Sequence, residues 1–446
     1  MRPIGIDLFA GAGGLSLGFE QAGFDVVAAV EIDPIHSAVH AFNFPGCAML
    51  PRSVEGLTGA AIRKAAGIGR RRVDVVFGGA PCQGFSLIGH RVLDDPRNNL
   101  VREFVRIVGE LQASYFLFEN VKGLTVGRHR AVLEELIEAF DAIGYQVRMP
   151  WRVLDAAQYG VPQHRERLFL FGARKGLPLP EYPAALTRAA DDGWNKGGKK
   201  SPTCRDAIGD LPDADRFDAL LDSDEVHPGK WREPSTYARE LRCLTNDAWH
   251  YGYVREWNPA VLTSSARTDH TDISKRRFAE TPPGQVEPIS RFFKLDGDGL
   301  SNTLRAGTDA ARGAFTSPRP IHFDLPRCVT VREMARLHGF PDWFRFHATK
   351  WHGARQIGNS VPPPLARAVA GALMKALRIE PMRPETRISL GDPALIRMGM
   401  LEASEHFGID NPIGRRDRKS GAKKRKQHEI EALRYVAREE AAIVGN

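Results

Sequence analysis

The chain has 446 residues, of which 42% are apolar and 26% charged, a balance typical of a globular protein that folds in water. No apolar run approaches the roughly 20 residues that a membrane-spanning helix needs, and the acid near the N-terminus predicts that no signal peptide is present. The five cysteines are odd in number and form no Cys-x-x-Cys pair, which argues against structural zinc and a disulfide framework and favours a reducing cytoplasm. The formal charge is +8, but residues 415–426 carry eight Lys and Arg against one Asp, so the remaining chain is nearly neutral. Net charge therefore does not tell whether the folded body binds nucleic acid, and the basic run is typical of a solvated segment.

The first expected element is a strand over residues 4–9, followed by a glycine-rich turn over residues 10–14 and a helical pattern. Glycines in such a turn let a ligand approach the backbone, and the amides of the helix start point at it. The next strand, residues 24–30, ends at Glu31, about 20 residues after the glycines, where a carboxylate suits the hydroxyls of a ribose. The glycine turn and Glu31 together predict a nucleotide-type binding site. The alternative is that the glycine turn binds no ligand and that Glu31 is an ordinary surface residue.

Residues 73–77 predict a buried strand, and the sequence Gly-Gly-Ala-Pro-Cys-Gln-Gly-Phe-Ser follows it at residues 78–86. The two glycines end the strand, Pro81 stiffens the chain before Cys82, and the later glycines give a loop that can move. A thiol presented at the mouth of a strand is placed as a nucleophile, because a thiolate reacts readily once its surroundings favour it. The alternative is a buried structural cysteine.

Two further strand patterns follow. Residues 115–118 lead into Glu119, and residues 167–171 follow a polar cluster at residues 163–167, with an amphipathic helix over residues 133–140 between them. Strands that alternate with helices predict an α/β fold with a doubly wound, mostly parallel sheet. Ligands of such sheets bind beyond the carboxyl ends of the strands, and this edge receives all four candidate features: the glycine turn, Glu31, Cys82 and Glu119.

The periodic pattern ends near residue 180. Residues 180–300 are rich in Pro, Gly, Trp and charge and show no clear period, so we expect a second, irregular domain. Near its end, Thr330 and Glu333 predict a capping box at the start of a short helix over residues 330–337. Residues 355–377 predict one final helix.

Six stretches of the sequence resemble, in order, the motifs of the C5-cytosine DNA methyltransferases. They are residues 7–20, 78–86, 119–121, 163–167, 330–341 and 355–363. The resemblance covers residues 4–376, and six motifs at compatible spacing do not arise by chance. It implies a Rossmann-like, S-adenosylmethionine-dependent methyltransferase sheet with a smaller target-recognition domain.

The resemblance also implies the division of the chain. We expect a catalytic and cofactor-binding domain over residues 1–178 plus 356–378, and a target-recognition domain over residues 179–355. Residues 379–446 lie outside the resemblance, and we expect them to form a basic, partly disordered C-terminal extension.

In the family, S-adenosylmethionine lies in the glycine-turn cradle, which implies that Phe9 contacts the adenine and Glu31 the ribose hydroxyls. The expected cofactor-binding residues are Phe9, Gly11, Gly13, Gly14, Glu31, Ile32, Val54, Pro81, Leu100, Asn359, Ser360 and Val361. The family usually has Asp at the position of Ser53, near the adenine amino group, so we expect weaker cofactor binding but the same cofactor. Ala80 stands where proline is common, and we expect little effect because Pro81 remains.

The resemblance implies that Cys82 attacks C6 of a flipped-out cytosine while Glu119 hydrogen-bonds or protonates N3. C5 then accepts the methyl group, and loss of the C5 proton releases Cys82. Arg167 resembles the family residue on the cytosine O2 side, and Arg165 one that supports the cysteine loop. The expected DNA contacts on that loop are Gln83, Ser86 and Arg97.

The implied partner is double-stranded DNA. The resemblance implies either the modification partner of a restriction endonuclease or a solitary DNA methyltransferase. We expect a monomer with no metal that acts in the cytoplasm on the nucleoid. The alternatives are an RNA cytosine methyltransferase of this fold and a catalytically inactive DNA-binding protein. The long 180–300 region argues against the first, since a duplex reader needs a domain that enters the major groove, and the intact catalytic set argues against the second. The recognised sequence is not predicted. Arg239, Arg242 and Arg255 are candidate base readers, and the alternative is that they are plain surface charge.

Overall fold

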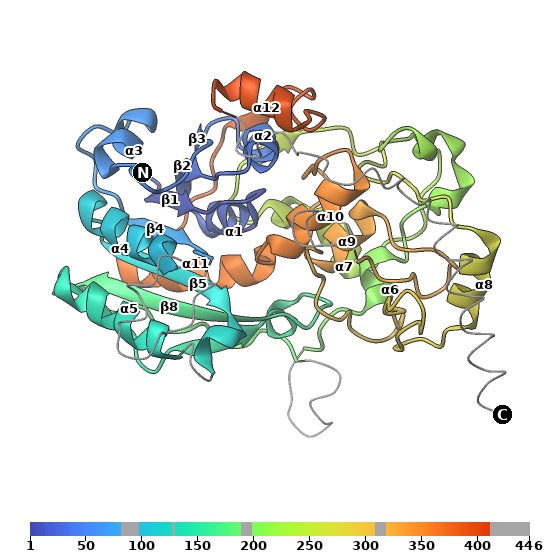
Figure 1. Cartoon of the computed structure of the whole chain (residues 1–446), viewed down its shortest axis with the longest axis horizontal. Coiled ribbons are helices and arrows are strands. Elements are labelled where there is room, and N and C mark those ends of the chain that lie inside the picture. The colour runs from blue at the N-terminus through green and yellow to red at the C-terminus, as the bar shows by residue number, and fades with distance from the viewer. Residues whose placement is uncertain (82–97, 127–129, 189–198, 308–317, 411–446) are drawn as a thin grey trace, which may run out of the picture.

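The computed structural model describes residues 1–81, 98–126, 130–188, 199–307 and 318–410. An eight-stranded sheet lies at the centre of the N-terminal half (Figure 1). Its first five strands across the sheet are parallel: β3 (Ala48–Leu50), β2 (Asp25–Val30), β1 (Ile4–Leu8), β4 (Val75–Gly78) and β5 (Tyr115–Val121). The other three are antiparallel pairings: β8 (Glu166–Arg174) beside β5, and β6 (Tyr145–Val147) and β7 (Arg152–Asp155) beside β8.

Helices cover both faces of this sheet, as a doubly wound fold requires. One face is covered by α1 (Gly14–Ala22) and α11 (Pro363–Leu377). The other is covered by α3 (Gly59–Ala65), α4 (Asn99–Leu111) and α5 (Arg130–Ala142). α2 (Pro34–Asn43) lies at the β2–β3 edge. The predicted α/β class with a mostly parallel sheet is confirmed.

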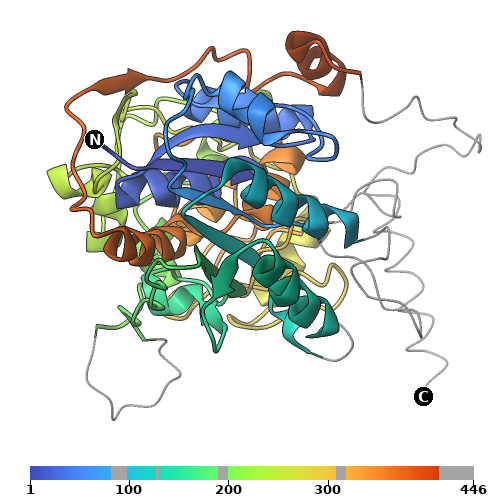
Figure 2. The same cartoon turned by 90° about the vertical axis from the view of Figure 1, so that its left-hand side faces the viewer.

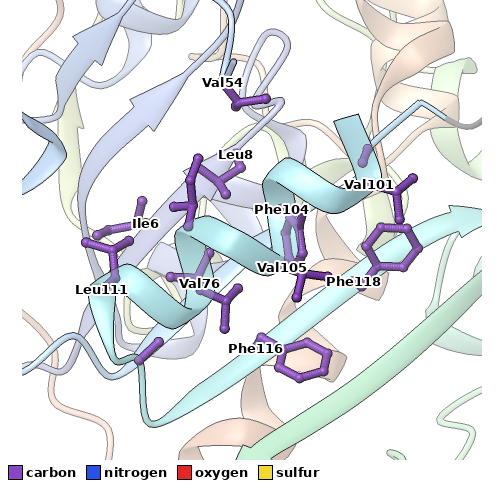
Figure 3. Close-up of a cluster of buried hydrophobic side chains, with 14 of the residues drawn as sticks. Ile6, Leu8, Val54, Val76, Val101, Phe104, Val105, Leu111, Phe116 and Phe118 are labelled. Atoms are coloured by element: carbon purple, nitrogen blue, oxygen red, sulfur yellow. The ribbon is translucent and has the colours of Figure 1, made fainter. Parts of the chain in front are cut away.

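The strands are buried on both sides, and their side chains alternate between two hydrophobic clusters. Phe116 and Phe118 of β5 point toward α4, where Figure 3 shows them packed around Phe104. Tyr115 and Leu117 of the same strand belong to the opposite cluster with α1 and α11. This alternation fixes the sheet's register, because a slip by one residue would exchange the two clusters.

The second half of the molecule contains short helices and loops, as the sequence predicted. Its helices are α6 (Cys204–Ile208), α7 (Thr236–Leu241), α8 (Asp272–Glu280), α9 (Val331–Leu337) and α10 (Lys350–Asn359). Buried ion pairs supplement its hydrophobic core: the Arg336 guanidinium donates to both carboxylate oxygens of Asp342 and to Asp210 at 3.2 Å. The capping box of Thr330 and Glu333 at the start of α9 is confirmed.

One segment that was predicted to form a single helix forms two helices. The segment expected as one helix over residues 355–377 divides into α10, which ends at Asn359, and α11, which begins at Pro363. The prolines at 362–364 explain the break, because proline lacks the N–H that would continue α10 but is favoured in the first turn of α11. The resulting turn, residues 360–362, is thereby available to border a site.

Beyond α11 the chain forms β10 (Arg387–Ser389), which pairs with β9 (Val254–Glu256), and then α12 (Met400–Phe407), which lies against α2 (Figure 1). The 3-10 helices in the described ranges are η3 (Lys122–Thr125), η5 (Ala156–Tyr159), η6 (Ala214–Arg216), η7 (Asp218–Leu221) and η8 (Asn246–Trp249). In the described ranges we find no helix that is both long and apolar enough to cross a lipid bilayer.

Candidate active site

A cavity of about 640 Å³ lies beyond the carboxyl ends of β1, β2, β4 and β5. Phe9 follows β1, Glu31 follows β2, Gly79 follows β4, and Glu119 lies near the end of β5, so four neighbouring strands each contribute to the wall. Eleven of the twelve expected cofactor residues border the cavity: Phe9, Gly11, Gly14, Glu31, Ile32, Val54, Pro81, Leu100, Asn359, Ser360 and Val361.

The twelfth, Gly13, does not line the cavity. It is the N-cap of α1 with φ of 102°, and a Cβ added there would lie 2.5 Å from the Phe44 ring. The position therefore requires glycine both for its left-handed backbone and for its packing.

Glu31 fixes the shape of the glycine turn. Its carboxylate accepts the N–H of Gly11 and the N–H of Asp33, each at 2.9 Å. Burial raises the pKa of Glu31, although His36 and these two N–H groups oppose the shift. Glu31 borders the cavity, and each carboxylate oxygen has a further lone pair that can accept a hydrogen bond from a ribose hydroxyl.

The turn between α10 and α11 closes the cavity from the opposite side. Ser360 Oγ donates to the Gln356 carbonyl at 2.7 Å, which holds the turn to α10. A Cβ at Gly14 would lie 2.5 Å from the Val361 carbonyl oxygen, so the two turns are in direct contact. Residues more than 300 positions apart in the chain thus form one wall.

Glu119 and Arg167 form an ion pair at the other end of the cavity. Glu119 Oε1 lies 3.0 Å from Arg167 Nε, and both side chains are largely buried. Burial raises the pKa of Glu119, while Arg167 and Arg165 oppose this shift. Gly79 allows the approach, because a Cβ there would lie 2.4 Å from Glu119 Oε2. A carboxyl group in this setting can hold a proton or donate a hydrogen bond nearer to neutral pH than an exposed glutamate.

Arg165 does not border the cavity. Its guanidinium is buried and donates to the Leu304 carbonyl at 2.9 Å and to the Gly358 carbonyl at 2.7 Å. Arg165 therefore joins the 301–305 segment to the end of α10 and adds positive charge behind Glu119.

Cys82, Gln83, Ser86 and Arg97 lie outside the described residues. Pro81 precedes this segment, Leu100 follows it closely, and both border the cavity. The chain thus enters and leaves the 82–97 segment at the cavity. Asn120 Nδ2 donates to the Ala80 carbonyl at 2.8 Å and fixes β5 to the start of that segment.

Sequence reasoning missed several residues that border the cavity. They are Asp33, His36, Arg52, Asn120, Val121, Arg355 and Gln356. Some had a signal: Asn120 and Val121 belong to the third motif, Arg355 and Gln356 to the sixth, and Asp33 caps α2 with its side chain. His36 has none, because a helix histidine has no distinctive spacing.

One candidate base reader is misassigned. Arg255 is buried, and its guanidinium lies 2.7 Å from Glu20 of α1 and over the Trp343 ring. The prediction that Arg255 reads bases is therefore wrong, because the side chain links β9 to α1. The Arg242 side chain is mostly buried, and its guanidinium lies over the Trp231 ring. The Arg239 side chain is about half exposed and lies beside Glu233.

Residues 4–375 match the model of the family described as C-5 cytosine-specific DNA methylase. The chain belongs to this family. The Type II methyltransferase M.XorII of Xanthomonas oryzae pv. oryzae is 59% identical over 433 residues, 97% of this chain and 99% of that protein. M.AgeI of Thalassovita gelatinovora, also a Type II methyltransferase, is 32% identical over 83% of this chain and 99% of its own. The crystal structure of a DNA modification methyltransferase encoded within an E. coli prophage matches with a TM-score of 0.66 at 32% identity, covering 84% of this chain and 99% of that one.

The family assignment identifies a DNA (cytosine-5) methyltransferase that uses S-adenosylmethionine. The cavity fits this cofactor: about 640 Å³ is a typical volume for a ligand of this size, the aromatic Phe9 and apolar Ile32 suit a purine ring, and Glu31 suits a ribose. When bound, the cofactor supplies an electrophilic methyl group.

Ser53 borders the cavity, and its Oγ accepts the Glu55 N–H at 3.1 Å. We expect Ser53→Asp to bind S-adenosylmethionine more tightly by about tenfold, because a carboxylate can keep the turn bond and accept a stronger hydrogen bond from the adenine amino group. Calorimetric titration measures this, with Ser53→Asn as the uncharged control. Equal affinities for the serine and aspartate proteins would contradict it.

A buried polar chain lies beneath the glycine turn of this methyltransferase. Ser16 Oγ donates to Asp7 Oδ2 at 2.6 Å and lies 3.0 Å from His40 Nε2. Asp7 Oδ1 has no hydrogen-bond partner among the described residues. Burial raises the pKa of Asp7 to about 8 and lowers that of His40 to about 3, so both side chains are largely neutral at pH 7.

We therefore expect stability to depend on the Asp7 proton. Its contribution is fully present below the unfolded pKa of about 4 and is lost as the pH rises through about 8. Asp7→Asn removes this titration, so its unfolding free energy relative to wild type should rise with pH by up to about 1.4 kcal/mol per unit. Urea unfolding at several pH values measures the difference, with the exposed Asp141→Asn as control. A difference that does not change with pH would exclude a shifted Asp7.

Proposed function

We propose that this methyltransferase modifies one specific duplex DNA site through a covalent bond between Cys82 and C6 of a flipped-out cytosine, as the modification partner of a restriction endonuclease. The observation that supports this most is the joint position of the buried Glu119–Arg167 pair and Pro81 on one cavity with the cofactor-side residues. An acid, a cysteine-bearing segment and a methyl-donor pocket can then act on a single base.

In the proposed reaction, the Cys82 thiolate forms a bond to C6 while Glu119 donates a hydrogen bond or proton to N3, so the ring electrons gather at C5. C5 takes the methyl group as its bond to the donor sulfur breaks. A base then removes the C5 proton, the returning electrons expel Cys82 as a thiolate, and N3 returns any proton it received to Glu119. Cytosine is a poor electrophile, so both the thiolate and the acid are needed.

The other cysteines are poor candidates for the nucleophile. Burial raises the pKa of each cysteine in the described ranges, namely Cys47, Cys204, Cys243 and Cys328. These thiols therefore stay protonated at neutral pH, and a protonated thiol is a weak nucleophile.

Incubating the purified protein with a labelled methyl donor and either DNA or tRNA tests the proposal. Label in duplex DNA is the expected result. Label in tRNA alone would favour an RNA methyltransferase, and label in neither would favour an inactive DNA-binding protein. Bisulfite sequencing of DNA from a host that expresses the chain would identify the modified site, and protection of that site from a co-expressed endonuclease would test the restriction partnership.

We further propose that residues 1–178 plus 356–378 are the catalytic domain and residues 179–355 the target-recognition domain. The sheet and its covering helices fall within the first set, which supports this division. Most of the second set packs around Phe340, Trp343 and Phe344, in a cluster that Leu17 and Phe44 of the first set also join. We also propose a monomer that acts at the nucleoid; the described wall of the cavity comes from one chain, which supports a monomer.

The basic run at residues 415–426 lies outside the described residues. If it contacts phosphates, truncation after residue 410 should weaken non-specific DNA binding and flatten its salt dependence, since each phosphate contact contributes about 0.9 to the slope of log K against log salt. Binding titrations at several salt concentrations measure this, with a full-length chain whose eight basic residues in that run are glutamine as the second variant. If the salt dependence is unchanged in both variants, the basic run does not contact DNA phosphates and is a solvated segment.

A further inference from the structure

The segment that follows α11, residues 379–410, is called the C-terminal strap below. Figure 2 shows it leaving α11 and running along the outside of the molecule to β10 and then to α12. The family model ends at residue 375, so the strap lies outside the part that the family shares. The match to M.XorII spans 433 residues and therefore extends into this region.

The strap packs against the cofactor side of the enzyme. Leu395 and Ile396 are buried in a cluster with α2 and with Ala12 of the glycine turn. Ala12 also borders the cofactor cavity, so Ile396 and Leu395 support that wall from behind.

A second contact holds the strap to the C-terminal end of α2. The Gly391 N–H donates to the Phe42 carbonyl at 2.9 Å, and a Cβ at Gly391 would lie 2.9 Å from Phe42 Cα. The strap therefore approaches α2 more closely than any residue with a side chain allows.

The same strap holds the target-recognition region. β10 pairs in parallel with β9. Arg397 lies 3.7 Å from Asp224 Oδ1, and Arg345 shares that carboxylate at 3.0 Å. These contacts lie in the region that also contains the two remaining candidate base readers, Arg239 and Arg242.

The strap also reaches the segment before α10. The Ala348 N–H donates to the Ile396 carbonyl at 2.8 Å, and His347 Nε2 donates to the Met398 carbonyl at 3.1 Å. α10 begins at Lys350 and ends at Asn359 in the opposite wall of the cofactor cavity. The strap is thus in contact with α2, with the chain leading into α10, and with the target-recognition region.

We propose that the C-terminal strap is a brace that positions the two walls of the cofactor cavity and the target-recognition region relative to each other. DNA reading and methyl transfer both need a fixed separation between the regions that perform them. Gly391, Ile396 and Arg397 act as positioning residues, since none borders the cavity in the described structure. The part of the inference that is tested by DNA binding rests on the proposed function. The part that is tested by cofactor binding does not.

The first test uses full-length Gly391→Ala, whose added methyl group pushes the strap away from α2 without removing any buried side chain. We expect its dissociation constant for S-adenosylmethionine, measured calorimetrically without DNA, to rise at least about fivefold, or about 1 kcal/mol. The matched control is Gly371→Ala on α11, where an added Cβ meets nothing within 4 Å. The control should bind within about twofold of wild type.

The second test uses Arg397→Glu, which places a negative charge beside Asp224. We expect affinity for DNA that carries the modified site to fall at least about fivefold. Arg383→Glu is the control on the same strap, because it makes the same change of charge beside Asp247, which is exposed, whereas Asp224 beside Arg397 is buried. Circular dichroism establishes that each variant is folded.

The proposal is overturned if Gly391→Ala binds the cofactor like wild type, even with a lower melting temperature, since the strap would then only stabilise the fold. It is also overturned if Arg397→Glu leaves DNA affinity unchanged. Because cofactor binding needs no reaction at Cys82, loss of the proposed covalent mechanism would leave the first test intact.

Discussion

Cys82→Ser is expected to reduce methyl transfer below about a thousandth of the wild-type rate, because a serine hydroxyl stays protonated near neutral pH and no general base for it is assigned. Binding of DNA and of S-adenosylmethionine should persist, since the substitution only exchanges one sulfur atom for oxygen and leaves the residues that border the described cavity unchanged. Single-turnover transfer of labelled methyl to DNA measures the effect, alongside a binding titration with the same DNA.

The same variant can be tested for the covalent bond itself. DNA with 5-fluorocytosine at the modified position should trap wild-type protein, because fluorine replaces the proton whose loss releases the enzyme. Cys82→Ser should form no adduct, whereas Cys243→Ser should form it normally, since burial raises the pKa of Cys243 and keeps it an unreactive thiol. An adduct that survives in Cys82→Ser, or one absent from wild type, would remove Cys82 as the nucleophile.

Much of the sheet and cavity could be predicted because local patterns and fold-level rules agree there. The strand, glycine turn and helix at residues 4–22 are contiguous, and the carboxyl-end rule places Glu31 and Glu119 on one edge without knowledge of any contact. The capping box at Thr330 was predictable for the same reason, since both partners lie within one turn.

The remainder depends on contacts between distant segments. In the sequence, Arg255 is indistinguishable from an exposed arginine that could contact DNA bases. Only the folded chain brings Glu20 and Trp343 into contact with it. Residues 379–410 are rich in Pro, Gly and charge, which is typical of a loop, yet a few apolar residues such as Ile396 find a partner surface on α2. No local period encodes such docking, because the partner lies more than 300 residues away.

Glu119→Gln is expected to lower the rate of methyl transfer by about two to three orders of magnitude, the range typical of losing a general acid. Glutamine is close to isosteric and can still donate a hydrogen bond, but it cannot deliver a proton to N3. Burial raises the pKa of Glu119, so the wild-type enzyme keeps the protonated form to higher pH than an exposed glutamate would. The variant also leaves Arg167 without its anionic partner.

The direction of the pH dependence follows. As the pH rises through the raised pKa of Glu119, the proton is lost, and the wild-type single-turnover rate should fall; the glutamine variant should lack this decline. Glu166→Gln is the matched control, because Glu166 is exposed on the neighbouring strand and pairs with Lys122 at 2.8 Å. It should retain both the rate and the pH profile. If Glu119→Gln lost less than about tenfold, or kept the wild-type decline at high pH, the acid that acts on N3 would have to be another group.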